Sequence, residues 1–230
     1  MSSAIITGAS RGLGLALARA LAGRGRRLVI DARGADALET VRAELAELTE
    51  VVAVSGDVAD PGHRRELAAA AGPSLELLVN NASVLGPSPQ PRLADYPLDV
   101  LEQVYAVNVL APLALVQLVL PLLPAGGRIV NITSDAAVEG YEGWGGYGSS
   151  KAALEQLGNV LAAEHPELRV YTVDPGDMRT QLHQEAFPGD DISDRPPPEE
   201  SVPGLLALIE GELPSGRYRA ADLVALETKQ

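Results

Sequence analysis

The residues best suited to chemistry are Tyr147 and Lys151, which stand four positions apart, with Ser134 thirteen residues before the tyrosine. A helical turn takes ~3.6 residues, so a helix would place the phenol and the ammonium on one face. The ammonium favours the phenolate and so lowers a phenol pKa that is ~10 when unperturbed. Such a phenol can protonate a developing alkoxide, or accept the proton of an alcohol in the reverse direction. These three residues therefore predict a proton-transfer site.

A Tyr-x-x-x-Lys pair by itself is also common on the solvent-facing side of an amphipathic helix. The interpretation as a reactive pair depends on the elements that would position it. Short apolar runs predict strands at residues 4–7, 28–30, 51–54, 75–79, 128–133 and 169–173. Helical patterns cover residues 15–22, 35–48, 62–71, 100–123, 147–163 and 202–209, and a last strand is expected within 217–226. This alternation is typical of an α/β fold, a parallel sheet with helices on both faces.

The chain has 230 residues, 46% of them apolar, and no linker or internal repeat, so we expect one domain over residues 1–230. A formal net charge of −13 disfavours nucleic acid and anionic membranes as partners. No cysteine is present, which excludes disulfides, Cys-ligated zinc and thiol nucleophiles. We also expect no metal site, because His63, His165 and His183 lack metal-ligand spacing and are interpreted as surface or loop residues.

The N-terminus has no basic region before its first apolar run, so we expect no signal peptide and a cytoplasmic protein. The most apolar stretch, residues 107–123, contains Asn108, Pro112, Gln117 and Pro121. These residues favour a buried or interface helix over a membrane span.

The segment Thr7-Gly8-Ala9-Ser10-Arg11-Gly12-Leu13-Gly14 follows the first predicted strand and opens a helix. Glycines allow a tight turn and a close approach to a pyrophosphate, and a helix N-terminus offers free N–H groups and a positive dipole end. This strand–turn–helix context predicts dinucleotide binding, and a purely structural turn is the alternative.

The end of the second strand should meet the adenosine ribose, where an acid favours NAD and a base favours the 2′-phosphate of NADP. In the string Ile30-Asp31-Ala32-Arg33, Ala32 takes the place of an NAD-binding acid and Arg33 follows it. Arg11 is a second candidate for the phosphate. We therefore favour NADP(H); NAD(H) is the alternative, because Asp31 in another register would bind the ribose.

Asp57 and Val58 follow the third strand, where the adenine should lie, and we expect them to contact it. Asp60 is instead expected to cap the next helix. Residues 187–200 are rich in Asp and Pro, which is typical of an irregular segment. Such a segment after the sixth strand is either a disordered surface loop or a mobile flap over the site.

These motifs together resemble the short-chain dehydrogenase/reductase family, over residues 4 to about 180. The resemblance is carried by the glycine turn, Asp57, Asn80-Asn81-Ala82, Asn108, Ser134, Tyr147, Lys151, Pro175-Gly176 and Thr180. It implies a Rossmann-like doubly wound sheet. The expected cofactor contacts are then Gly8, Ser10, Arg11, Gly12, Leu13, Gly14, Arg33, Asp57, Val58, Asn81, Ala82, Tyr147, Lys151, Pro175, Gly176 and Thr180.

The resemblance also implies catalytic roles. Tyr147 would be the general acid or base, and Lys151 would lower its pKa and bind the nicotinamide ribose. Ser134 would hydrogen-bond the substrate carbonyl, and Asn108 would hold a water in a proton relay linked to Lys151. The family usually follows Asn-Asn-Ala with glycine, whereas this chain has Ser83, which puts the local geometry near the cofactor in question.

Tyr141 and Trp144 stand just before Tyr147, and they either line a substrate pocket or pack a glycine-rich loop. The resemblance implies an NADP(H)-dependent carbonyl reductase or alcohol dehydrogenase acting on a small carbonyl or alcohol. It also implies a homodimer or homotetramer paired through the helices 100–123 and 149–163. The alternatives are a catalytically silent NAD(P)-binding regulatory or scaffold protein, and epimerisation through a transient ketone.

Overall fold

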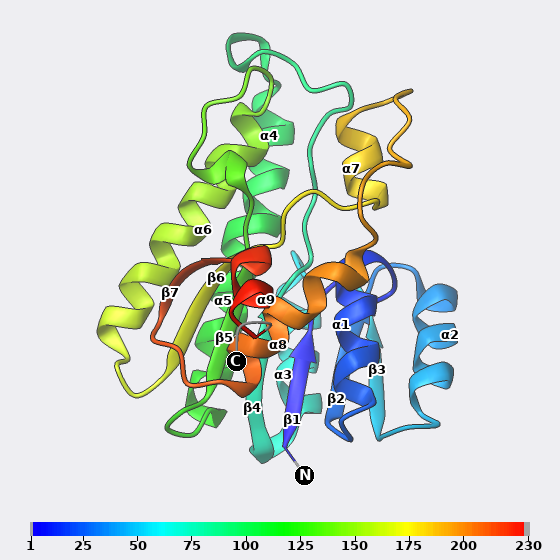
Figure 1. Cartoon of the computed structure of the whole chain (residues 1–230), viewed down its shortest axis with the longest axis vertical. Helices are drawn as coiled ribbons and strands as arrows, with labels where there is room; N and C mark the ends of the chain where they lie inside the picture. The colour runs from blue at the N-terminus through cyan, green and yellow to red at the C-terminus, as the bar shows by residue number, and fades with distance from the viewer. Residues whose placement is uncertain (1, 228–230) are drawn as a thin grey trace.

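The computed structural model describes residues 2–227, which form a seven-stranded sheet with helices on both faces (Figure 1). The strand order is β3-β2-β1-β4-β5-β6-β7, and every neighbouring pair is parallel. The chain therefore builds outward from β1 on one side and then restarts with β4 on the other, which confirms the doubly wound sheet. The strands are β1 (Ser3–Ile6), β2 (Arg27–Ala32), β3 (Val51–Ser55), β4 (Leu75–Asn80), β5 (Arg128–Ile132), β6 (Arg169–Asp174) and β7 (Gly216–Arg219).

The helices connect these strands and cover the two faces of the sheet (Figure 1). Most predicted helices are present with ends shifted by a few residues. They are α1 (Gly12–Ala22), α2 (Ala35–Leu45), α3 (Pro61–Ala71), α4 (Leu98–Tyr105), α5 (Ala111–Val119), α6 (Gly145–Glu164), α7 (Gln181–Ala186), α8 (Val202–Glu210) and α9 (Ala220–Glu227).

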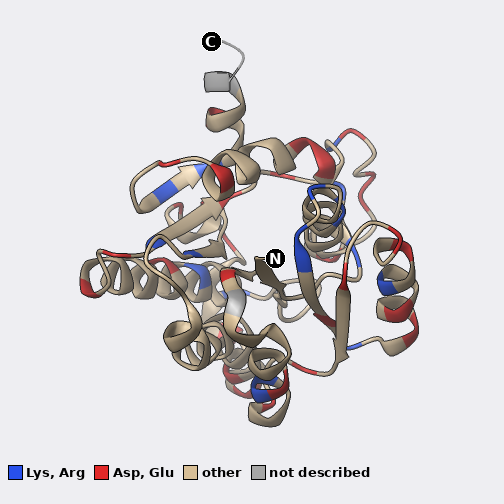
Figure 2. Cartoon of the chain, turned by 90° about the horizontal axis from the view of Figure 1, so that it is seen from below, with Lys and Arg blue, Asp and Glu red and all other residues tan. Residues whose placement is uncertain are grey.

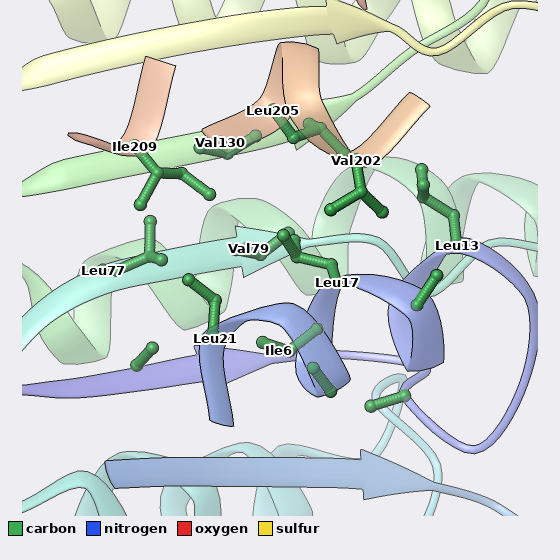
Figure 3. Close-up of a cluster of buried hydrophobic side chains, with 14 of the residues drawn as sticks. Ile6, Leu13, Leu17, Leu21, Leu77, Val79, Val130, Val202, Leu205 and Ile209 are labelled. Atoms are coloured by element: carbon green, nitrogen blue, oxygen red, sulfur yellow. The ribbon is translucent and has the colours of Figure 1, made fainter. Parts of the chain in front are cut away.

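Two apolar layers hold the helices to the sheet, because successive strand residues face opposite sides. Ile6 of β1 belongs to the layer under α1 and α8, whereas its neighbour Ile5 belongs to the layer under α3 and α5. Figure 3 shows the first layer, in which three leucines of α1 at four-residue spacing meet strand residues and α8; the residues labelled there are Ile6, Leu13, Leu17, Leu21, Leu77, Val79, Val130, Val202, Leu205 and Ile209.

The last predicted strand, residues 217–226, is wrong for most of its length. Strand β7 ends at Arg219, and Ala220–Glu227 forms helix α9. The sequence after Arg219 is rich in Ala and Leu, which favour a helix. The helix also packs closely on α8: a Cβ at Gly204 would lie 2.2 Å from the Ala220 carbonyl oxygen.

The long helix predicted for residues 100–123 is interrupted. Residues Ala106–Leu110 form a π-helical turn between α4 and α5, and the last turn, Leu120–Leu122, is a 3₁₀-helix. Pro112 lacks the amide hydrogen that an α-helix would donate to the Asn108 carbonyl, and the wider turn occurs at this place.

By length and composition alone, Leu98–Leu122 would suffice to cross a membrane, a test that the core helix of a folded domain also passes. Here α5 packs into the apolar layer shared with α3, through Leu115, Val116 and Val119. This packing favours the predicted buried helix. Figure 2 shows Asp and Glu on the outer helices around the sheet, in keeping with the net charge of −13.

Leu17 anchors α1 to the sheet and is only 1% exposed. We expect Leu17→Ala to lower the free energy of unfolding by about 2–5 kcal/mol, because the truncation leaves a cavity between α1 and the strands. Urea denaturation followed by circular dichroism measures this change. Leu48→Ala is the matched control, because Leu48 is 59% exposed. We expect it to change the free energy of unfolding by less than about 0.5 kcal/mol. Equal losses in the two variants would contradict the assignment of α1 to the core.

Candidate active site

A cavity of about 1260 Å³ opens along the carboxyl ends of the strands on both sides of the β1–β4 pair. Open parallel sheets bind ligands at this place, where the strand order reverses. Of the expected site residues, only Gly14 and Asn108 do not line the cavity. Those that line it are Gly8, Ser10, Arg11, Gly12, Leu13, Arg33, Asp57, Val58, Asn81, Ala82, Ser134, Tyr147, Lys151, Pro175, Gly176 and Thr180.

The glycine turn fits a pyrophosphate. Gly8 and Gly12 have positive φ angles of 67° and 56°, which side chains rarely adopt. Helix α1 begins at Gly12, and its first N–H groups have no partner within the helix. These groups and the helix dipole favour an anion at this end of the cavity. Gly14 acts through packing instead, since a Cβ there would lie 2.5 Å from the Gly8 carbonyl oxygen.

Strand β4 braces the turn from one side. The Asn81 amide donates to the carbonyl oxygens of Thr7 and Gly8, at 2.7 and 3.1 Å. The Thr7 hydroxyl accepts the N–H groups of Asn81 and Ala82, each at 3.0 Å. The Asn81 side chain therefore holds the shape of the cofactor turn.

Asp31 braces the turn from the other side. Its side chain is 1% exposed; Oδ1 accepts the Gly8 N–H at 2.6 Å, and Oδ2 lies 2.9 Å from His63 Nε2. Both carboxylate oxygens are thus occupied, which speaks against Asp31 as the ribose ligand. The prediction of His63 as a surface or loop residue is wrong: it is buried on α3, because it partners this carboxylate.

Two basic side chains lie at the same end of the cavity. Arg33 directly follows the last residue of β2, is exposed, and makes no ion pair with any described residue. The Arg11 guanidinium hydrogen-bonds Gln181 at the start of α7. Arg33 is therefore the better placed of the two to meet a 2′-phosphate.

The residues after β3 divide as expected between the cavity and the helix. Asp57 and Val58 line the cavity, and Asp57 Oδ1 accepts the Ala59 N–H at 2.8 Å. Asp60 is the N-cap of α3 and accepts the Gly62 N–H at 2.7 Å.

Tyr147 and Lys151 lie on one face of α6, as their spacing predicts, and both are buried. Lys151 Nζ donates to the Ile132 carbonyl oxygen at the end of β5, at 2.9 Å, and lies 5.4 Å from the centroid of the Tyr147 ring. Ser134 follows β5 and also lines the cavity. Its hydroxyl donates to Asp135 Oδ1 at 2.9 Å, so it must turn before it can bind a substrate oxygen.

Burial shifts both titratable groups of this pair. It raises the pKa of the Tyr147 phenol above its ordinary value, and a hydrogen bond with Ser83 opposes that shift. Burial also lowers the pKa of Lys151 to about 7. A site of low polarity disfavours the phenolate and the ammonium alike, and in the ligand-free protein this effect sets the direction of both shifts. That Lys151 lowers the phenol pKa stays a prediction.

Asn108 lies behind the cavity wall and is 0% exposed. Its Oδ1 accepts from the Val84 N–H and the Ser83 hydroxyl, at 2.9 and 3.1 Å. Its Nδ2 donates to the Val84 carbonyl and the Ser150 hydroxyl, at 2.9 and 3.0 Å. The carboxamide has no further capacity for hydrogen bonds. Any water held by Asn108 must therefore bind its main-chain carbonyl.

The turn after β6 is held in place by its neighbours. The Gly176 N–H donates to Asp174 Oδ1 at 3.0 Å, and the Ser201 hydroxyl donates to the Pro175 carbonyl at 2.8 Å. Thr180 caps α7 by accepting the His183 N–H. These contacts fix the Pro175-Gly176 turn, which lines the same cavity as Ser134.

The aromatic residues before Tyr147 take different positions. Trp144 lines the cavity, with its ring centroid 5.9 Å from that of Tyr147 and 6.0 Å from that of Phe187. Tyr141 is exposed, is not among the residues that line the cavity, and donates to Asp135 Oδ2 at 3.1 Å. Trp144 is therefore a wall of the pocket and Tyr141 is not.

Residues 187–197 connect α7 to a short 3₁₀-helix, Pro198–Ser201. The last residues of the segment predicted to be irregular, 187–200, therefore form a regular turn. Figure 1 shows α7 and this connection above the carboxyl ends of the strands. The Arg179 N–H donates to the Pro196 carbonyl at 2.8 Å, and the Arg195 guanidinium lies 3.7 Å from the Asp177 carboxylate. This placement favours a cover over the site, and whether the cover moves stays a prediction.

Sequence reasoning assigned no site role to many residues of the cavity wall, among them the polar residues Ser83 and His183. For Ser83 a signal existed, namely its replacement of glycine in the Asn-Asn-Ala string. His183 lies on α7, and only the tertiary structure brings it to the cavity. Over residues 2–227, no group of three or more His, Cys, Asp or Glu side chains is arranged to hold a metal ion.

Comparison with known proteins agrees with this geometry. A family model described as short chain dehydrogenase matches residues 2–191. The L-xylo-3-hexulose reductase of Hypocrea jecorina is 35% identical over 213 residues, covering 80% of this chain and 69% of its own. The sepiapterin reductase of Meriones unguiculatus is 35% identical over 198 residues, covering 78% and 75%.

Solved structures are also similar over almost the whole chain. A putative short chain dehydrogenase from Pseudomonas syringae superposes with a TM-score of 0.89 at 30% identity, covering 95% of this chain and 94% of that one. One from Shigella flexneri 2a, complexed with NADP, gives a TM-score of 0.88 at 29% identity, covering 96% and 97%. With its parallel sheet, its braced glycine turn and its buried Tyr147–Lys151 pair, this chain belongs to the short-chain dehydrogenase/reductase family of oxidoreductases.

Proposed function

We propose that this protein is an NADP(H)-dependent carbonyl reductase or alcohol dehydrogenase in which Tyr147 transfers the proton. The observation that carries the proposal is the burial of a phenol and an amine together at the wall of a cavity large enough for a dinucleotide and a substrate. Burial of two ionisable groups opposes folding, so their presence there argues for a functional use.

In this proposal the bound nicotinamide supplies the hydride. Tyr147 gives its proton to the carbonyl oxygen during reduction and takes it back during oxidation. Ser134 turns away from Asp135 and donates to the same substrate oxygen, which fixes the orientation of the carbonyl. Lys151 holds the nicotinamide ribose while its link to the Ile132 carbonyl keeps it in place.

The proposed cofactor preference is NADP(H). Arg33 is exposed at the cavity beyond β2, and the competing acid, Asp31, is committed to Gly8 and His63. Two structural relatives support the preference, since the Shigella flexneri enzyme was solved with NADP and one from Escherichia coli CFT073 with NADPH.

The proposed substrate is a small carbonyl compound with an apolar substituent. The wall beside Tyr147 is formed by Leu85, Trp144, Leu182 and Ala186, which pack as one apolar group. Trp144 lines this side of the cavity, and Phe187 packs against it with the ring centroids 6.0 Å apart. A flat or branched apolar group fits such a wall better than a charged one does.

A homodimer or homotetramer remains part of the proposal. Leu110, Leu118 and Val160 are 59%, 38% and 43% exposed on the helical segment 106–119 and on α6. Burial of these side chains against a second copy would remove apolar surface from water. The net charge of −13 supports a protein that binds neither nucleic acid nor anionic membranes.

A catalytically silent cofactor-binding protein is the competing proposal, and Tyr147→Phe separates the two. We expect this variant to lose about 10²–10⁴-fold in kcat for carbonyl reduction, because the proton donor is removed. NADPH binding, measured by fluorescence titration, should change little. Tyr218→Phe is the matched control. It removes the hydroxyl of a tyrosine on β7 that donates to the Pro214 carbonyl. A variant at position 147 that turns over a panel of ketones at the wild-type rate would sink the assignment.

The cofactor preference is tested with Arg33→Ala. We expect the Kd for NADPH to rise about 10- to 100-fold, because a charge-assisted hydrogen bond to phosphate is lost, whereas the Kd for NADH stays nearly constant. Isothermal titration calorimetry measures both. Arg65→Ala, which alters an exposed arginine of α3 outside the cavity, is the control. Equal weakening of NADPH and NADH would remove Arg33 from the phosphate site.

The cost of burying Lys151 predicts a pH-dependent stability in the ligand-free protein. Its pKa is about 7 in the folded state and ~10.4 in an unfolded chain, so the unfolded state binds more protons between these values. The penalty is complete below pH 7 and disappears as the pH rises to about 10.4. We expect Lys151→Met to raise Tm at pH 6.5, with a gain that shrinks steadily toward pH 10. A gain that is independent of pH would contradict the shifted pKa.

A further inference from the structure

His63 is a buried side chain that no step of the proposed mechanism uses. It lies in the first turn of α3, and its side chain is 4% exposed. Its Nε2 lies 2.9 Å from Asp31 Oδ2, whereas Nδ1 has no hydrogen-bond partner among residues 2–227. An apolar side chain would fill this space without burying polar nitrogens. The presence of histidine therefore points to a use for the bond that Nε2 makes.

The bond has a definite direction. A carboxylate can only accept hydrogen bonds, so His63 Nε2 is the donor and Asp31 Oδ2 the acceptor. The other carboxylate oxygen, Oδ1, accepts the Gly8 N–H at 2.6 Å. In the part of the chain that the structure describes, His63 is the side chain that bonds Asp31. The Asp31 carboxylate is thus oriented by one donor at each oxygen.

Gly56 provides the space for the imidazole ring. A Cβ at this position would lie 2.3 Å from His63 Nδ1. Gly56 directly follows β3 and lines the cavity just before Asp57 and Val58, where the adenine is expected. The ring therefore packs between the adenine end of the cofactor site and Asp31, which braces the pyrophosphate turn.

The pyrophosphate turn depends on the orientation of this carboxylate. Gly8 stands at the bend of the turn with a φ of 67°, and Asp31 bonds its N–H. Without a donor at Oδ2, the carboxylate would have an unpaired oxygen in a buried place, which favours its rotation toward water in the cavity. Asp31 also lines the cavity, so this rotation would bring negative charge toward the space of the pyrophosphate. A donor at Oδ2 opposes both changes.

We propose that His63 is a positioning residue for the cofactor: its bond from α3 keeps the Asp31 carboxylate on the Gly8 N–H and so preserves the pyrophosphate turn. The role is common to NADPH and NADH, because both carry the same pyrophosphate. It differs from the role of Arg33, which is proposed to meet only the 2′-phosphate. The inference concerns binding and does not depend on the reaction assigned to Tyr147.

The test measures the Kd for NADPH and for NADH by isothermal titration calorimetry in His63→Leu and His63→Gln. In His63→Leu we expect Kd to rise about 10-fold for both cofactors, because a hydrogen bond to a charged group is lost. A glutamine amide can donate from nearly the place of the imidazole Nε2, so His63→Gln should stay within about threefold of the wild type. Wild-type affinity in His63→Leu, or an equal loss in the two variants, would overturn the proposal.

The expected loss is partial, because the turn keeps its second brace. Thr7 and Asn81 still hold it from β4 in both variants. His165→Leu is the matched control, since His165 follows α6, lies 3.0 Å from the Glu167 carboxylate and is not among the residues that line the cavity. Its affinities for NADPH and NADH should equal those of the wild type.

An Asp31→Ala background shows whether His63 acts through Asp31. If it does, His63→Leu should change Kd by less than about twofold in that background, because the carboxylate that it positions is absent. A further loss of about 10-fold there would contradict the proposal, since the two substitutions would then act independently. Each titration is made below the thermal transition of the variant, so that a purely structural role of His63 would lower Tm and leave Kd unchanged. None of these measurements needs turnover, so an inactive wild type would refute the proposed reaction and leave this test intact.

Discussion

The site depends first on the parallel alignment of the strands, which brings the carboxyl ends of β1, β4 and β5 to one edge of the sheet. The hydrogen bonds between Thr7 and Asn81 cross from β1 to β4 at the point where the chain changes direction. They hold the glycine turn open toward the cavity. The bond from Lys151 to the Ile132 carbonyl ties α6 to the end of β5 in the same way. Cofactor turn and proton donor thus share one rigid frame.

Within that frame, burial sets the chemistry of the pair. Tyr147 and Lys151 are both almost inaccessible, so the same low polarity that raises the phenol pKa lowers the amine pKa. In the ligand-free protein the phenol therefore stays protonated, and the amine loses its proton far more easily than an exposed lysine does. A charged cofactor and a polar substrate would change this environment, which couples the reactivity of Tyr147 to binding.

Much of the fold was predictable from local pattern. Buried parallel strands appear in a sequence as short, continuous apolar runs. Residues 28–30 and 169–173 are such runs, and each is too short for a helix and lies between helical patterns. The segment after Arg219 was misassigned because its short apolar run fits a strand as well as a helix, and only packing on α8 distinguishes them. Residues 100–123 were predicted as one uninterrupted helix. Pro112 cannot donate a hydrogen bond to the Asn108 carbonyl, and the resulting π-helical turn changes the helix locally without ending it.

The sequence by itself determined the succession of strands and helices along the chain, the phosphate-binding turn and the spacing of Tyr147 and Lys151, because these follow from periodicity and residue type within a few positions. The tertiary structure decided which charged side chains are held by partners within the protein and which are exposed to a ligand. Asp31 and Arg33 are two residues apart, and the sequence favoured Arg33 while leaving Asp31 as the alternative. In the structure the Asp31 carboxylate binds Gly8 and His63, while the Arg33 guanidinium is exposed. Such assignments depend on contacts between residues far apart in the chain, and on burial, neither of which a local pattern contains.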